Sequence, residues 1–174
     1  MGWKVLWIVL AIGFDQAVSH WFFSAWSGFD WYVQSQLVLI LLIYWQLHDR
    51  SDKMIVFGLI VGWIYDSASD QLLLGVHALS YGLILLVLRW HGFSWMPADP
   101  IRWFIVCELG MVVNEFILYA IHWMFKQTEI AFSWAFIHQT MPIAIVHLIG
   151  ITLFIGIQYL YRLLRNNQRF GLKS

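Results

Sequence analysis

The sequence predicts an all-α bundle of six transmembrane helices, and its composition, length and hydropathy pattern all support that fold. Hydrophobic residues make up 61% of the 174 residues and charged residues only 11%, whereas soluble domains average about 45–50% and about 25%. Six spans of about 20 residues fit within this length. Apolar runs such as 37–44 and 82–88 lack the alternation typical of strands. The composition excludes a soluble enzyme, a disordered chain and a nucleic-acid-binding domain with a basic face.

The predicted spans follow the long apolar runs, because a helix satisfies its own backbone hydrogen bonds in lipid. In chain order they are Lys4–Phe23, Tyr32–Leu47, Met54–Ser69, Leu72–Trp90, Ile101–Phe125 and Ala135–Tyr161. Residues 1–174 then form a single membrane domain that ends in a short basic tail, 162–174. Pro142 lies inside the last span and is expected to kink it.

The basic residues predict which side of the membrane each loop faces. With both termini in the cytoplasm, only Lys126 of the 10 Lys and Arg residues lies on the outer side. Such an excess of Lys and Arg marks the cytoplasmic side. The 12 tryptophans also divide into two equal groups near the two sides, as aromatic belts at headgroup level require. The sequence therefore predicts six crossings with both ends inside.

Ionisable residues inside the spans are costly in lipid and are therefore candidates for function. The buried polar candidates are Asp15, Glu108, Glu115, His122 and His147. Glu108, Glu115 and His122 are seven residues apart, so they share one helix face. Three interpretations stay open for the set: hydrogen bonds that fix helix packing, a polar groove for a partner helix, and a pathway for protons, metal or substrate.

Signatures of catalysis and metal binding are missing from the sequence. No nucleophile motif or phosphate-binding glycine loop occurs. The histidines on the outer side lack the i, i+4 spacing of metal ligands. We therefore predict no catalytic residue, no metal site and no cofactor.

The most specific pattern lies in the third span and the turn after it. Gly58, Gly62 and Asp66 are four residues apart and form a nearly axial stripe. The glycines allow another backbone to approach closely, and Asp66 can accept hydrogen bonds across the interface. A short turn leads to Gly75 and His77, so the third and fourth spans should form an antiparallel hairpin. We predict a helix-packing or partner-binding motif with a contact between Asp66 and His77.

At this motif the sequence resembles the MreD family, small polytopic proteins of the bacterial rod-shape machinery. The segment 39–45 also resembles the family's second span, and the specific part of the resemblance covers about residues 37–89. The matching positions of the motif are Gly58, Gly62, Asp66, Ser69, Leu74, Gly75, Ala78 and Leu79.

The resemblance implies a non-enzymatic scaffold or regulator in the bacterial inner membrane. Its implied partners are a single-span MreC-like protein and, directly or indirectly, the MreB filament, RodA and a transpeptidase. Such a complex controls peptidoglycan synthesis and cell shape. No nucleic acid is expected as a partner, and a homodimer stays open.

Two other functions compete with the scaffold. The family's fold is thought to resemble the S-component of energy-coupling transporters, so the runner-up is a small-molecule-binding transporter subunit with Asp15, Glu115 and His147 around a pocket. The third hypothesis is an intramembrane hydrolase, which would need a nucleophile or a metal beside Asp66 and His77.

Overall fold

The computed structural model describes residues 2–25, 35–49, 51–69, 73–91, 100–126, 128–145 and 147–148. These residues form helices and turns without a strand, which confirms the all-α class. Most of the predicted sixth span and the tail 162–174 lie outside the described residues. The elements are α1 (Gly2–Ala25), α2 (Leu37–Asp49), α3 (Asp52–Ala68), α4 (Val76–Trp90), α5 (Pro100–Met124), α6 (Phe132–Ala135) and the π-helical turn η1 (Phe136–Thr140).

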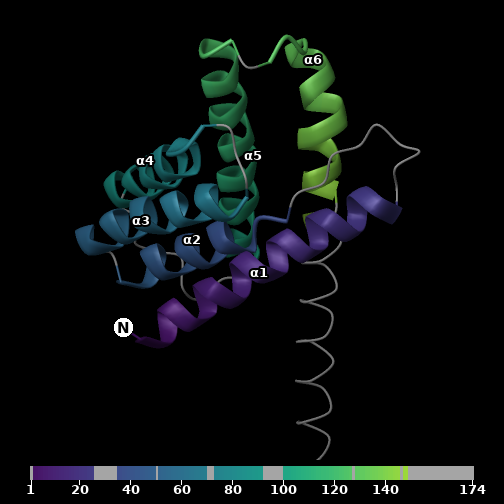
Figure 1. The fold of residues 1–174 in the computed structure, drawn as a ribbon. Coiled ribbons are helices and arrows are strands. Elements are labelled where there is room, and N and C mark those ends of the chain that lie inside the picture. The colour runs from purple at the N-terminus through teal and green to yellow at the C-terminus, as the bar shows by residue number, and fades with distance from the viewer. Residues whose placement is uncertain are drawn as a thin grey trace, which may run out of the picture.

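Helix α2 occupies the centre of the described bundle, where α1, α3, α4 and α5 all contact it (Figure 1). Its 13 residues are almost entirely apolar, which is typical of a helix enclosed by other helices. Its buried residues are Val38, Leu39, Leu42, Ile43, Trp45, Gln46 and Leu47. All of them except the polar Gln46 form one core with apolar side chains from α1, α3, α4 and α5.

Helices α3 and α4 form the predicted antiparallel hairpin and share the most extensive interface in the described chain. Ser51 caps the start of α3 by accepting a hydrogen bond from the Lys53 amide at 3.3 Å. Gly75 precedes α4 with φ of 96°, a left-handed conformation that favours glycine. This conformation lets the chain enter α4 directly against α3.

Two helices begin later than the sequence pattern predicted. The second span was expected from Tyr32, but Ser35 and Gln36 are not helical and α2 starts at Leu37. The fourth span was expected from Leu72, but residues 73–75 form a turn and α4 starts at Val76. The observed helix starts differ from the predicted span starts because a hydropathy run marks where residues are apolar, whereas a helix starts where its first amides find acceptors.

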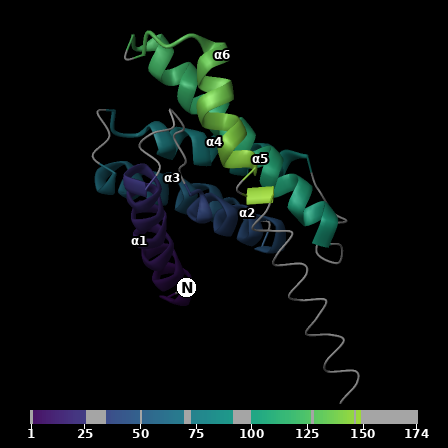
Figure 2. The ribbon, with the colours of Figure 1, turned by 90° about the vertical axis from the view of Figure 1, so that its right-hand side faces the viewer.

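Helix α6 lies beside α5 in both views (Figures 1 and 2). Aromatic side chains join the two helices. The Phe116 ring lies 5.5 Å from the Phe132 ring, and Tyr119 donates a hydrogen bond to the Ile130 carbonyl at 2.9 Å. The π-helical turn η1 ends at Thr140, two residues before Pro142. Proline lacks an amide hydrogen and clashes with the preceding turn, so the expected distortion near Pro142 takes this form.

Two ion pairs gather four helix ends at one end of the bundle. Lys4 in the first turn of α1 pairs with Asp49 at the end of α2. Arg89 near the end of α4 pairs with Asp52 at the start of α3 through a 3.0 Å contact. We call this the basic end of the bundle. The basic residues at this end, Lys4, Lys53 and Arg89, are among those predicted to face the cytoplasm.

Within the described residues, one helix is long and apolar enough to cross a membrane by itself. It runs from Trp103 to Met124 with a mean hydropathy of 1.8, while α2 and α4 are apolar but shorter. Large apolar side chains such as Leu6, Trp63 and Leu79 are exposed, more than a soluble monomer normally tolerates. The six spans and their orientation remain a prediction.

Candidate functional site

The side chain of Asp66 closes the start of α4. Its Oδ2 accepts a hydrogen bond from the Gly75 amide at 2.7 Å, and both carboxylate oxygens lie 3.2 Å from the His77 amide. These amides belong to the first turn of α4 and its cap, which have no partner within their own helix. A carboxylate there also interacts favourably with the positive end of the helix dipole. Asp66 is completely buried, so it caps α4 inside the bundle.

The predicted contact between Asp66 and His77 is confirmed, with His77 Nδ1 2.6 Å from Asp66 Oδ1. A carboxylate has no hydrogen to donate, so in this contact the imidazole Nδ1–H is the donor. Tyr65 and Tyr81 enclose the imidazole, with ring centroids 4.8 Å and 5.6 Å from that of His77. The pair therefore lies in a closed aromatic environment.

Gly62 sets the distance between α3 and α4. A Cβ atom at this position would lie 2.5 Å from both the Cα and the amide nitrogen of Ala78. Backbone atoms cannot rotate away, so only glycine permits this approach. At Gly58 the corresponding neighbour is the Leu85 side chain, which can adopt another rotamer. The stripe of small residues thus packs inside the hairpin, and its partner-binding role stays a prediction.

Asp15 caps the start of α2 in the same way that Asp66 caps α4. This residue of α1 accepts hydrogen bonds from the Leu37 amide at 3.0 Å and from the Val38 amide at 3.2 Å. It is completely buried, as predicted for a residue deep in the first span. The sequence argument missed its role, because the predicted second span began at Tyr32 and left no free amides near residue 37.

Further polar side chains join α5 to the starts of α2 and α4. Glu115 of α5 accepts a hydrogen bond from the side-chain amide of Gln36. Ser80 of α4 donates to the side-chain carbonyl of Asn114 at 2.6 Å. Sequence reasoning missed Gln36, Ser80 and Asn114 because neutral polar residues in a span are common. The one clue in the sequence was that Asn114 comes directly before Glu115, which was already a buried polar candidate. We call Asp15, Gln36, Asp66, His77, Ser80, Asn114 and Glu115 the polar layer.

The remaining predicted polar residues lie apart from these contacts. Glu108 is half-buried, and its Oε1 has no hydrogen-bond partner among the described residues. The ring nitrogen Nδ1 of His122 lies 2.8 Å from the Leu118 carbonyl of its own helix. His147 is half-buried, with Nδ1 unpaired in the described part of the chain. Across the described ranges, no three His, Cys, Asp or Glu residues group in a way that could hold a metal ion.

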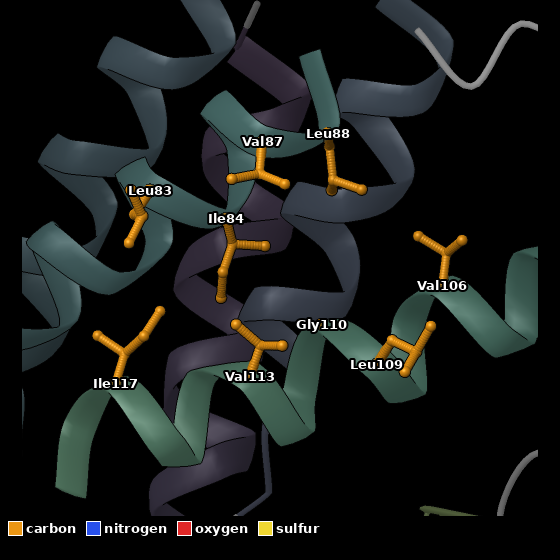
Figure 3. A pocket seen from close by; sticks show the side chains of 9 residues that line it. All are labelled: Leu83, Ile84, Val87, Leu88, Val106, Leu109, Gly110, Val113 and Ile117. Atoms are coloured by element: carbon orange, nitrogen blue, oxygen red, sulfur yellow. The ribbon is translucent and has the colours of Figure 1, made fainter. Parts of the chain in front are cut away.

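A wholly apolar groove of about 200 Å³ lies between α4 and α5 (Figure 3). Figure 3 shows the side chains of both helices pointing toward the space between them. On α5, Leu109 and Val113 keep 59% and 45% of their surface exposed. The lining residues are Leu83, Ile84, Val87, Leu88, Val106, Leu109, Gly110, Val113 and Ile117. This groove can hold an apolar helix or chain, and it offers no polar group for chemistry.

Comparison with known proteins identifies a family. A family model described as rod shape-determining protein MreD matches residues 1–165. No curated protein and no solved structure matches the chain. The family match covers all the described residues and includes the α3–α4 hairpin on which the resemblance was based.

Proposed function

The chain belongs to the MreD family of rod shape-determining proteins, and from that premise we propose that it is a non-catalytic subunit that binds a single-span, MreC-like protein. Family membership makes it a bacterial membrane protein of the rod-shape system. We further propose that it crosses the inner membrane six times, and that through its partner it helps control peptidoglycan synthesis.

The observation that best supports partner binding is the apolar groove between α4 and α5. A single-span partner has one apolar helix, which needs a matching surface inside the bilayer. Helix pairs in membranes associate through close packing, because lipid tails give no hydrophobic driving force. The groove offers a concave surface for that packing, and none of its nine lining residues is polar.

Contacts of the polar layer and of Gly62 hold in place the two helices that line the groove. Asp66 and Gly62 fix α4 against α3, and Ser80 with Asn114 fixes α4 against α5. The spacing of the two groove walls therefore depends on buried contacts that a partner would not itself touch. In this proposal the Gly62 and Asp66 motif acts on partner binding through the shape of the hairpin.

Co-purification with an MreC-like partner tests the proposal. Val113→Trp would fill the groove, since Val113 lies on its wall and is 45% exposed. We expect recovery of the partner to fall at least several-fold. The matched control is Val56→Trp, because Val56 is 56% exposed on α3 and does not line the groove. Equal recovery with the two variants, at equal expression, would contradict the assignment of the groove.

A transporter subunit remains the second candidate, and the meeting of Asp15, Gln36 and Glu115 favours it. Gln36 is 4% exposed and its Oε1 lacks a hydrogen-bond partner among the described residues, as a ligand-binding amide would. This function predicts that a small molecule raises the unfolding temperature of the purified protein. Loss of that stabilisation in Gln36→Leu, with partner binding intact, would favour the transporter over the scaffold.

A further inference from the structure

A second cavity lies at the basic end of the bundle, away from the apolar groove and the polar layer. Its volume is about 240 Å³, and it opens between the first turn of α1, the end of α2 and the start of α3. Its lining residues are Lys4, Asp49, Ser51, Lys53, Met54 and Phe57. The cavity therefore combines charged groups with an apolar floor of Met54 and Phe57.

The charges of this cavity do not cancel. Lys4 pairs with Asp49 and, beyond the cavity, Arg89 pairs with Asp52. Lys53 is exposed and has no carboxylate within ion-pair distance among the described residues. The cavity thus keeps one positive charge that no described acidic residue neutralises.

The donors around the cavity suit an anion with several oxygens. The Lys4 ammonium has three hydrogens, of which one goes to Asp49 and one to the Met54 sulfur at 3.7 Å, so one is left to donate; the ammonium lies 5.4 Å above the Trp45 ring. Ser51 Oγ accepts the Lys53 amide hydrogen, which leaves its own hydroxyl hydrogen to donate. The positive end of the 17-residue helix α3 adds to the attraction.

We propose that this cavity binds the headgroup phosphate of an anionic phospholipid, with the first part of its acyl chain against Met54 and Phe57. The apolar floor favours a lipid over a free phosphate or an acidic peptide, because neither of these has an acyl chain to cover it. The cytoplasmic leaflet, which the basic end is expected to face, concentrates anionic lipids. The proposal is independent of the partner protein.

Native mass spectrometry of the full chain in detergent tests it, with phosphatidylglycerol and phosphatidylcholine titrated separately. We expect tighter binding of phosphatidylglycerol. Lys53→Gln should weaken that binding about five-fold, the effect of roughly one surface lysine, and weaken phosphatidylcholine by less, because its choline already offsets the phosphate charge. Arg89→Gln is the matched control, because Arg89 lies at the same end without lining the cavity.

Three outcomes would overturn the proposal. Equal binding of the two lipids would mean that the cavity does not distinguish an anionic headgroup from a zwitterionic one. Equal weakening by Lys53→Gln and Arg89→Gln would indicate a diffuse attraction instead of a site. Displacement of the lipid by millimolar inorganic phosphate or by an acidic peptide would assign the cavity to a soluble anion. Lys53 is exposed, so its substitution leaves the fold intact and the comparison valid.

Discussion

The substitution Gly62→Ala tests the contact between α3 and α4 with the smallest possible change. The added Cβ would lie 2.5 Å from the Ala78 Cα and amide nitrogen, whereas ordinary contact begins at 3.4 Å. The two backbones must therefore separate by about 1 Å, because atoms of a helix backbone cannot rotate away. The same movement pulls Asp66 from the amides of Gly75 and His77, one turn further along.

The cost has two parts. Overpacking of a buried interface costs about 1–3 kcal/mol. Stretching the bonds to a buried carboxylate adds a part of the about 1.5–3 kcal/mol that each bond to a charged group contributes. We expect a total loss of about 3 kcal/mol. For a chain of this size that loss lowers the unfolding temperature by roughly 6–12 °C.

Cys107 provides the assay, because it is the only cysteine in the sequence and is completely buried. A thiol-reactive fluorogenic dye will label it only when the protein unfolds, so labelling during a temperature ramp gives the midpoint. Gly13→Ala is the matched control, since a Cβ there meets nothing within 4 Å. Its midpoint should stay the same or rise slightly, because alanine favours the helix.

Two results would refute the reasoning. A Gly62→Ala midpoint within about 2 °C of the wild type would mean that the helices do not approach as closely as the structure shows. Rescue by the added change Ala78→Gly would mean that the clash involves the Ala78 side chain, whereas the structure places backbone atoms there. Gly58→Ala should cost less, since its neighbour is the movable Leu85 side chain.

Two further predictions concern the polar layer and use the same labelling assay. Asp15→Leu removes both acceptors at the start of α2 and should cost about 2 kcal/mol, whereas Asp15→Asn keeps one acceptor and should cost about half as much; equal midpoints for the two variants would contradict the capping role. Ser80→Ala leaves Asn114 Oδ1 buried without its donor and should cost about 1 kcal/mol. The double variant Ser80→Ala/Asn114→Leu should recover most of that loss, and a larger loss in the double variant would show that Asn114 has another essential contact.

The sequence allowed prediction of contacts that depend on depth and helix face. The Asp66 and His77 contact was predicted from the hairpin, which puts the two residues at similar depth, and the structure shows that their side chains also face each other. The burial of Asp15 followed from its position in an apolar span. The close approach at Gly62 followed from the spacing of small residues, although only the structure shows that Ala78 backbone is what it meets.

Backbone acceptors and donors were harder to predict. The capping of α2 by Asp15 depends on the helix beginning at Leu37 instead of Tyr32, which hydropathy does not reveal. The contacts of Gln36 with Glu115 and of Ser80 with Asn114 join distant segments, and each requires a helix rotation that an apolar sequence leaves undetermined. His122 was expected to join other helices through the shared face of α5, but its ring contacts the Leu118 carbonyl of its own helix.

Capping by buried aspartates also has a consequence for the surrounding lipid. The caps fix where α2 and α4 start, and the two helices are 13 and 15 residues long. At about 1.5 Å per residue these lengths are about 20 and 22 Å. A bilayer's hydrocarbon layer is about 30 Å thick. Other helices enclose α2, but if α4 crosses the membrane as proposed, lipid beside it must thin to match it, at a cost that grows with each ångström of mismatch. Asp66 would thereby give the protein a preference for thin or locally deformed membrane, a property set by a side chain that is itself completely buried in the bundle.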